Sequence, residues 1–331
     1  MRKRSKINSS CSIYPLKVRA MVDEMLTLEP RLTFTLDTET YRKFNVTRLE
    51  PIFKNFYIQP ILFGSKKDLT ILSEYLWISN SEKWYDNMSN RYCYGTFKKK
   101  YILVPHLYKT VENYYSYGDK ILDVGCGDGI LVEEILRKLT NEVYGSELFK
   151  DSVDRLKLKF PSIKSHFYTN NVAGESTVGD TAKYDIVIGS MLLSNIIDEN
   201  RALKNLVRKL KKGGYLIVAD LNPYYYKALG YYYENELVPL HNPNSQFFTE
   251  KRIDGLTVAV HAYRPWGLYK ELLQGYKMCL VNDYVLSVDA RLMKKALRKS
   301  RIPKKYADEF WKKSRKIRPT PPFYILVMRK F

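Results

Sequence analysis

The stretch from Ile121 to Gly129, which reads ILDVGCGDG, constrains the fold of this chain more than any other feature. Its apolar start suits a buried parallel strand, and its three glycines allow the backbone to approach a ligand closely. The next segment, 130–139, has apolar residues at helical spacing. Eighteen residues after Gly129, Glu147 ends a second apolar run. This order of strand, glycine-rich turn, helix and strand predicts a nucleotide-binding βαβ unit.

The spacing of the glycines indicates which nucleotide to expect. A dinucleotide-binding fingerprint needs a glycine at the position where this chain has Ile130. That fingerprint also has no acid inside its strand, whereas this chain has Asp123 there. The pattern here is Asp-x-Gly-x-Gly-x-Gly, which resembles motif I of the class I S-adenosylmethionine-dependent methyltransferases. The resemblance implies S-adenosyl-L-methionine as cofactor.

That resemblance also implies roles for single residues. Asp123 would organise the glycine-rich loop near the methionine amino group, and Glu147 would accept hydrogen bonds from both ribose hydroxyls. Cys126 is expected to be a small loop side chain rather than a nucleophile, because no neighbour that would lower its pKa is visible. The remaining expected contacts of the cofactor at these two strand ends are Gly125, Cys126, Gly127, Gly129 and Leu148.

The chain beyond this unit continues the resemblance. The helix before Gly213 resembles the family's helix-then-Gly-Gly passage, and Gly213 is expected to cap that helix in a left-handed conformation. The passage 263–277 resembles the Arg-Pro, helix, Gly-aromatic passage of the branch that includes quinone-biosynthesis and natural-product methyltransferases. The further strands are expected at 143–145, 165–169, 184–189, 215–219 and 323–328. The implied fold is α/β, a Rossmann-like, doubly wound, mostly parallel seven-stranded sheet with helices on both faces.

One departure from the family pattern concerns the adenine. After the third strand the family usually carries an acid that meets the adenine amino group, whereas this chain has Asn170, Asn171 and Val172. An amide carbonyl can still accept that hydrogen bond. We therefore expect Asn171 and Val172 to contact the cofactor, together with Ser190 at the end of the next strand.

A second departure concerns the catalytic base. After the fourth strand many relatives carry a histidine pair, but residues 191–197 read MLLSNII, which puts a base at that location in doubt. His241 and His261 are the candidates by their place in the sequence. A base is needed only if the acceptor is a hydroxyl or a protonated amine.

The organisation around this core is uneven. Residues 1–75 are expected to form an N-terminal extension of unassigned fold, although 51–60 has the character of a strand, and 76–331 the methyltransferase domain. Helices between Trp77 and Val111 are expected to cover the cofactor, with Tyr94 or Tyr101 as a contact of its methionine end, and packing alone is the alternative role of either tyrosine.

Two insertions are expected within that domain, at 222–254 and at 289–318. Loops at the carboxyl ends of the strands face the ligand crevice in this fold, so the tyrosine-rich insertion 222–254 is expected to roof the acceptor site. A surface loop without such a role is the alternative. The expected contacts of the acceptor are Tyr231, Tyr232, Tyr233, Tyr263 and Arg264.

The net charge of +20 is concentrated at two places. The residues before Asp23 contribute +6, and the segment 291–318 contributes +11 from thirteen Lys or Arg against two acids. Such blocks suggest an anionic partner, namely a phosphate-bearing substrate, a nucleic acid or an acidic peptide. The alternative is an amphipathic surface helix whose lysines are only solvated.

Other sequence signals narrow the class of protein. No run approaches the 18 or so apolar residues that a membrane span needs, no secretory signal begins the chain, and the four cysteines and four histidines lack metal-site spacing. We therefore expect a cytoplasmic enzyme that methylates an O, N or C atom of a small-molecule or peptide acceptor. An RNA such as a tRNA is the alternative acceptor, and a non-catalytic subunit that retains the fold is a third reading.

Overall fold

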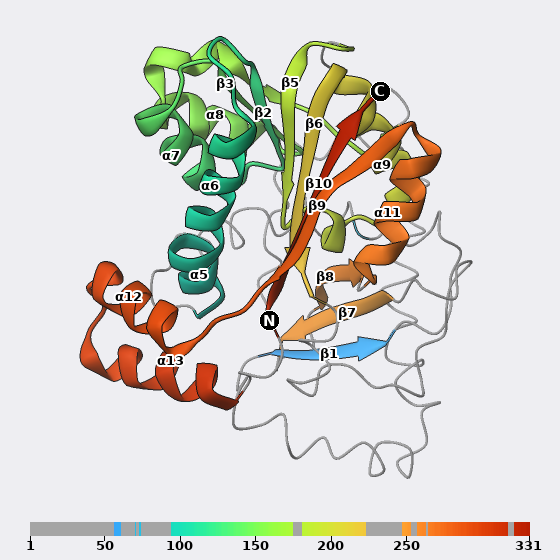
Figure 1. The fold of residues 1–331 in the computed structure, drawn as a ribbon. Coiled ribbons are helices and arrows are strands. Elements are labelled where there is room, and N and C mark those ends of the chain that lie inside the picture. Colours follow the sequence, from blue (N-terminus) through green and yellow to red (C-terminus); the bar gives the residue numbers. More distant parts are fainter. Residues whose placement is uncertain are drawn as a thin grey trace, which may run out of the picture.

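The computed structural model describes residues 56–60, 70, 73, 94–174, 181–222, 247–252, 257–262, 264–316 and 321–331. A seven-stranded sheet in the order β4-β3-β2-β5-β6-β10-β9 forms its centre (Figure 1). Neighbouring strands from β4 to β6 pair in parallel, whereas β10 pairs antiparallel with both β6 and β9. The expected Rossmann-like, mostly parallel sheet is confirmed.

The first half of the sheet follows the βαβ pattern of the sequence. Its strands are β2 (Ile121–Val124), β3 (Val143–Glu147), β4 (Phe167–Thr169) and β5 (Tyr184–Ser190). The connecting helices are α7 (Ile130–Lys138) and α8 (Lys150–Lys159). Strand β4 is shorter than expected, because Ser165 and His166 belong to a 3-10 helix, η4 (Pro161–His166), which starts at a proline.

The second half contains β6 (Leu210–Leu221), β9 (Met278–Leu286) and β10 (Phe323–Lys330). Gly213 is left-handed, with φ of 82°, but it does not cap a helix, because α9 (Glu199–Lys209) has already ended and β6 has begun. That expectation was wrong. Lys330 Nζ donates instead to the carbonyl oxygens of Val207 and Leu210 at 2.9 and 2.7 Å, and a cation suits the carbonyl end of a helix.

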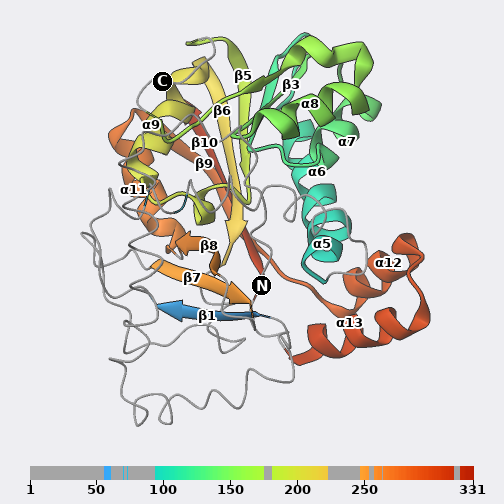
Figure 2. The ribbon, with the colours of Figure 1, turned by 180° about the vertical axis from the view of Figure 1, so that it is seen from behind.

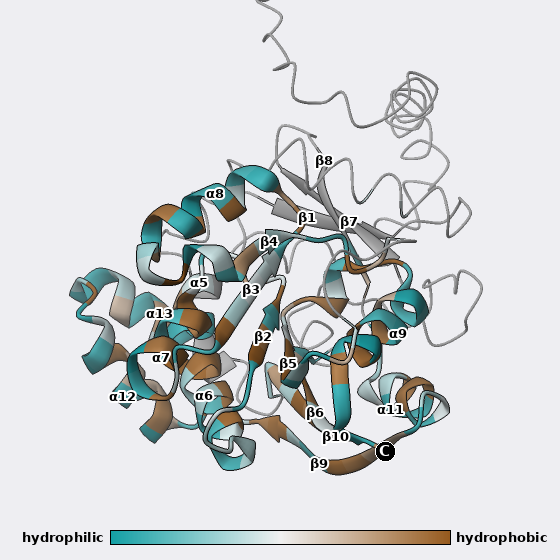
Figure 3. Ribbon diagram, turned by 90° about the horizontal axis from the view of Figure 1, so that it is seen from above, coloured by the Kyte–Doolittle hydropathy of each residue, from teal (hydrophilic) through white to brown (hydrophobic). Residues whose placement is uncertain are grey.

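Helices cover both faces of the sheet, as Figure 3 shows from above. One face packs against α6 (Val104–Tyr114), α7 and α8 through apolar side chains such as Val111 and Ile135. The other face packs against α9 and α11 (Trp266–Gly275) through side chains such as Leu206 and Leu273. The strands between them are buried on both faces, which explains their uninterrupted apolar sequences.

A second, three-stranded sheet has the order β1-β7-β8, and all its pairs are antiparallel. Its strands are β1 (Phe56–Pro60), β7 (Phe247–Arg252) and β8 (Thr257–Ala262). Figure 1 shows it beneath the end of the large sheet toward which the β6 arrow points. Strand β1 comes from the expected N-terminal extension and β7 from the expected insertion 222–254, so these two additions meet in one sheet.

A helical layer lies beside the large sheet. α5 (Tyr94–Lys98), a π-helical turn η3 (Lys99–Leu103) and α6 follow one another without a break. Next to them lie α12 (Ala290–Ser300) and α13 (Lys304–Lys316), on the flank opposite α9 and α11 (Figures 1 and 2). None of the helices in the described ranges is long and apolar enough to span a bilayer.

Candidate functional site

The glycine-rich loop after β2 is held tightly against the neighbouring strand ends. The N–H groups of Gly125 and Cys126 both donate to the carbonyl oxygen of Ser146, at 2.8 and 3.2 Å. Gly125 and Gly129 have φ values of 69° and 74°, and a Cβ at Gly125 would come within 2.8 Å of Leu192. Both positions therefore favour glycine for conformation, and a side chain at Gly125 would also displace Leu192.

Buried polar side chains without a protein partner surround this loop. Asp123 Oδ1, Ser146 Oγ, Ser190 Oγ and both side-chain polar atoms of Asn170 are buried and make no hydrogen bond within the described structure. They lie at or just beyond the ends of β2, β3, β4 and β5, where neighbouring parallel strands finish at one edge. Buried polar groups are rarely left unsatisfied, so this row of groups indicates a polar ligand.

The electrostatics of the loop depend on two carboxyl groups and one lysine. Burial raises the pKa of Asp123 to about 7, and the negative charges of Glu147 and Asp128 act in the same direction. Burial also raises the pKa of Glu147, against hydrogen bonds from the N–H groups of Leu148 and Gly127. Lys99, on η3, opposes both shifts by its positive charge. The site thus combines a buried carboxyl group, Asp123, and a partly buried one, Glu147, with one nearby cation.

Cys126 has no nucleophilic character in this setting. Its side chain is buried in the core cluster, and burial raises the pKa of its thiol well above the usual value. The charges of Asp123 and Glu147 raise that pKa further. Only a thiolate is a good nucleophile, so Cys126 contributes its backbone and its small volume.

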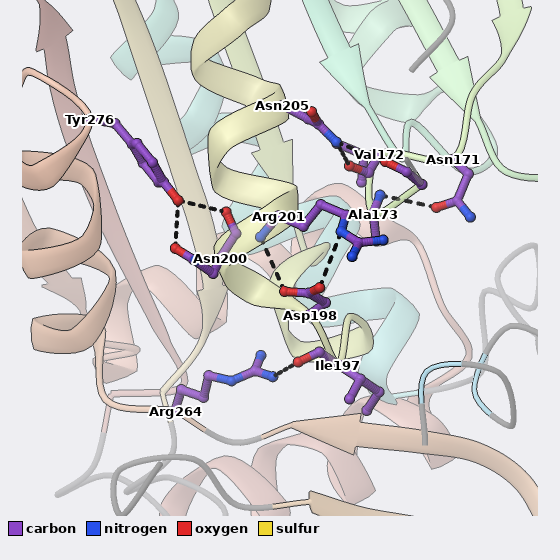
Figure 4. A network of polar contacts seen from close by, with 11 residues as sticks. Asn171, Val172, Ala173, Ile197, Asp198, Asn200, Arg201, Asn205, Arg264 and Tyr276 are labelled. Carbon is purple, nitrogen blue, oxygen red and sulfur yellow. Dashed lines mark hydrogen bonds and ion pairs between the residues drawn. The ribbon is translucent and has the colours of Figure 1, made fainter. Parts of the chain in front are cut away.

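The segment after β4 is arranged differently from the expectation. Asn171 Oδ1 accepts from the N–H of Ala173 at 3.0 Å, and the carbonyl of Val172 accepts from Asn205 at 2.8 Å (Figure 4). The amide of Asn171 is therefore occupied in a local turn. Asn170 is the amide that is buried without partners within the described structure, so it is a second candidate for an adenine contact beside Asn171.

The segment after β5 contains a strained residue and a histidine partner. Met191 has φ of 56°, which is uncommon for a residue with a side chain, and its carbonyl accepts from Asn195 Nδ2 at 2.8 Å. Asn195 lies on the 3-10 turn η5 (Leu193–Asn195), and its Oδ1 is 2.9 Å from His261 Nδ1. A histidine from β8 thus reaches the location where the sequence of β5 and its loop showed no base.

The hydrogen bonds of Asn195 determine the tautomer of His261. Because Asn195 Nδ2 donates to a carbonyl, its Oδ1 is the atom that faces the ring and it can only accept. His261 Nδ1 must then carry the proton, and Nε2 is the basic nitrogen of the neutral ring. This is the tautomer that a general base requires.

The side chain of Arg264 donates hydrogen bonds to the backbone of the same segment. Its guanidinium is buried and donates to the carbonyl oxygens of Leu193, Ile196 and Ile197 at 2.8 to 3.1 Å, the last of which Figure 4 shows. It also forms an ion pair with buried Glu199 at 3.1 Å. This position differs from the direct acceptor contact that we expected. Arg264 fixes the backbone that carries Asn195, and its side chain has no exposed surface.

The other expected site residues fall in three groups. Tyr101 lines a groove between α6 and α12, whereas Lys99 is the residue of η3 whose charge reaches Asp123. Leu148 lies beside Glu147 and donates its N–H to that carboxylate at 3.3 Å. The positions His241, Tyr231, Tyr232, Tyr233 and Tyr263 lie outside the described residues.

Four relevant residues were not identified from the sequence. Asn170 and Ser146 had a usable signal, because both are polar residues at a strand end in the expected sheet. Lys99 and Asn195 had none, because each acquires its role from a segment distant in the chain.

The sheet order and the unsatisfied polar row define a Rossmann-like, ligand-binding α/β protein. A family model described as a methyltransferase domain matches residues 82–261, more than half of the 331-residue chain. The chain belongs to this methyltransferase domain family.

Comparison with curated proteins gives relatives in one branch. The chain is 28% identical over 152 residues to the ubiquinone biosynthesis O-methyltransferase of Coxiella burnetii, across 44% of this chain and 64% of that protein. For the protein of the same name from Aliivibrio fischeri the match is 29% over 146 residues, across 42% and 62%. The chain thus spans less than two thirds of these relatives. The expected resemblance to the quinone-biosynthesis branch is confirmed.

Among solved structures, the chain is similar to the 1,6-didemethyltoxoflavin-N1-methyltransferase of Burkholderia thailandensis. The likeness covers 82% of this chain and 94% of that one, with a TM-score of 0.52 and 10% sequence identity. At this identity the likeness shows a shared fold.

Proposed function

We propose that this protein is an S-adenosyl-L-methionine-dependent methyltransferase that acts on a hydroxyl group of a small acceptor. The observation that carries the proposal is the row of buried, unpartnered polar groups at the strand ends, around a loop where glycine is favoured. Membership of the methyltransferase domain family supports it. The structure from Burkholderia thailandensis is described with S-adenosylhomocysteine bound, which supports the same class of ligand here.

The residues present fit this cofactor group by group. Glu147 offers carboxylate oxygens to the ribose hydroxyls, and Asn170 offers an amide to the adenine. Asp123 suits the amino group of the methionine end, and Lys99 suits its carboxylate, because these charges are opposite. Asp123 and Asn170, two of the unsatisfied groups, would then gain a partner, which removes a penalty of about 1–3 kcal/mol per buried group.

When bound, the cofactor supplies a methyl group on a positively charged sulfur, which is already activated for transfer. The chain must then align the acceptor, exclude water and accept a proton where the acceptor has one. His261 Nε2 is the assigned proton acceptor, and Asn195 holds the ring in the required tautomer. This pair is the reason for proposing a hydroxyl acceptor, since a carboxylate acceptor would need no base.

The names of the relatives favour a small acceptor. The Coxiella burnetii and Aliivibrio fischeri proteins are named as O-methyltransferases of ubiquinone biosynthesis. We propose a hydroxylated aromatic ring as the acceptor class. Tyr231, Tyr232, Tyr233 and Tyr263 remain the proposed contacts of such a ring, because aromatic walls bind flat apolar groups and exclude water.

Two measurements test the proposal. Calorimetry should detect binding of S-adenosylmethionine and S-adenosylhomocysteine to the purified chain. Incubation with a panel of catechols and hydroxylated quinols should then give products heavier by one methyl group in mass spectrometry. A chain that binds NAD but neither sulfur compound at millimolar concentration would contradict the proposal.

A further inference from the structure

Helix α12 carries a stripe of five exposed cations on one face. They follow the spacing i, i+3, i+4, i+7 and i+8, which places them along a single side of a helix. The stripe is about 12 Å long at 1.5 Å per residue. Its members, called the α12 stripe below, are Arg291, Lys294, Lys295, Arg298 and Lys299.

In the described part of the chain the α12 stripe has no ion pair, and the two carboxylates that line the adjoining groove, Glu112 and Glu134, are paired with Lys109 and Lys138. Among the residues that the structure describes, no carboxylate lies within ion-pair distance of any of the five, and the helix itself contains no acid. Some exposed cations on other helices are paired, as in Lys150 with Asp154 on α8 and Arg201 with Asp198 before α9. Like charges one helical turn apart destabilise a helix by about 0.2–0.5 kcal/mol per pair. The stripe therefore carries an electrostatic cost that an anionic ligand would remove.

The surface beside the stripe is hollowed on two sides. One hollow, of about 580 Å³, is lined by Arg291, Lys294 and Arg298 among others. The second, of about 530 Å³, is the groove between α6 and α12. Lys295 and Lys299 line it from one side, and the ion pairs Lys109–Glu112 and Lys138–Glu134 from the other. The cations that the groove adds to the surface without a paired carboxylate are thus those of the stripe itself.

Aromatic rings accompany these cations. Tyr101 lines the groove, and Lys294 Nζ lies 5.9 Å from the centre of the Trp311 ring. Both rings are partly exposed. Cations that follow a groove, with rings beside them, are the pattern by which proteins hold single-stranded nucleic acids without reading their sequence.

We infer that the α12 stripe and the adjoining groove bind the phosphate backbone of a single-stranded nucleic acid. A single small anion would use only part of a stripe of about 12 Å. A membrane surface fits less well, because an interfacial helix inserts an apolar face. The apolar residues of α12 already pack on the core, where Met293 and Ala296 are buried and Leu292 and Leu297 are partly buried. No large exposed apolar residue among the described ones belongs to α12 or α13.

This inference does not depend on the proposed methyl acceptor, because the α12 stripe is separate from the residues assigned to the cofactor. The test accordingly uses no cofactor. Fluorescence anisotropy should measure binding of a labelled 20-nucleotide oligouridylate, and of oligothymidylate of the same length, at several salt concentrations. We expect binding at low salt that weakens linearly on a logarithmic salt scale.

The variant Lys294→Gln, Lys295→Gln, Arg298→Gln removes three cations of the stripe. We expect its affinity for oligouridylate to fall at least tenfold near 0.1 M salt. The salt slope should become shallower by about 2 if all three groups contact phosphates. The matched control is Arg201→Gln, Lys204→Gln, Arg208→Gln, which removes three exposed cations from α9 on the opposite flank. Its affinity should change less than threefold.

Three outcomes would overturn the inference. Equal losses in the two triple variants would show that net charge, rather than this surface, attracts the oligonucleotide. Unchanged affinity in the α12 variant would place the ligand elsewhere. Tighter binding to polyglutamate or to phosphatidylglycerol vesicles than to either oligonucleotide would assign the surface to an acidic peptide or a membrane. Circular dichroism and thermal unfolding of both variants exclude misfolding as the cause.

Discussion

Asn195 Oδ1 accepts a hydrogen bond from His261 Nδ1 at 2.9 Å, although the two residues are 66 positions apart in the chain. Asn195 comes from the turn after β5 of the large sheet, and His261 from β8 of the small sheet. This contact joins the two sheets beside the strand ends. It also leaves Nε2 as the basic nitrogen of the neutral imidazole.

Removal of this base should slow the reaction with a hydroxyl acceptor. We expect His261→Ala to lower kcat by about 10²- to 10⁴-fold, the usual contribution of a positioned base, with the affinity for cofactor unchanged. Asn195→Ala should have a smaller effect on kcat, since it removes the hydrogen bond that fixes the tautomer of His261 but leaves the imidazole in place. The exposed Asn282→Ala on β9 is the matched control and should keep wild-type turnover.

The pH profile separates a base from a structural histidine. The pH profile of kcat for His261→Ala should differ from that of the wild type, because the variant lacks the side chain that accepts the proton. If the variant keeps both the wild-type kcat and the wild-type profile, His261 is not the base.

Asp123 should make the cofactor-free protein less stable as pH rises. Its pKa is about 7 in the folded protein, against 3.8 as the ordinary value. Between these two pH values the folded state holds a proton that the unfolded state has lost, so stability falls with increasing pH. Asp123→Asn does not titrate. Its free energy of unfolding relative to wild type should therefore increase from pH 4 to pH 7, by at most about 4 kcal/mol.

Urea unfolding at several pH values measures this difference. The exposed Asp151→Asn on α8 is the control, and its difference from wild type should stay flat across the range. A flat difference for Asp123→Asn as well would mean that the carboxyl is already ionised in the folded protein.

Loss of the carboxylate of Glu147 should weaken cofactor binding. Glu147→Gln should reduce the affinity for S-adenosylhomocysteine by about 1.5–3 kcal/mol, because charge-assisted hydrogen bonds to the ribose become neutral or are lost. Glu133→Gln on the exposed face of α7 is the matched control. Calorimetry gives both affinities, and equal values for the two variants would contradict the assignment of Glu147.

Breaking the buried pair of Arg264 and Glu199 should destabilise the fold strongly. The two groups are 3.1 Å apart and inaccessible to solvent, so Arg264→Ala leaves an uncompensated buried carboxylate and three carbonyl groups without a donor. We expect a loss of about 3–5 kcal/mol. The exposed Arg201→Ala, which breaks the ion pair with Asp198, should cost less than about 1 kcal/mol. Urea unfolding measures the loss of stability in each variant. Similar losses in the two variants would contradict the structural role assigned to the buried pair of Arg264 and Glu199.

The sequence by itself determined the strands and helices from β2 to β6 and the last strand, β10, but not β7, β8 or β9. Strand ends such as Val124 and Ser190, and the turn through Gly125 and Gly129, were predictable because apolar runs and glycine spacing express local backbone preferences. Local reasoning failed at Gly213. Its left-handed φ was predicted, but the preceding helix α9 ends before it, at Lys209. The lysine that satisfies the end of that helix comes from the last strand.

Tertiary structure alone decided which side chains meet at the site. Lys99 acts on Asp123 because η3 lies against the ends of the strands, and Arg264 stabilises a turn some 70 residues earlier in the chain. The histidine that reaches the turn after β5 comes from β8, which no periodicity within β5 could reveal. Hydrogen bonds and charges act over a few ångströms in space. The spacing of residues within one segment therefore does not reveal which distant residues they join. Their partners become known only when the sheets bring distant segments together.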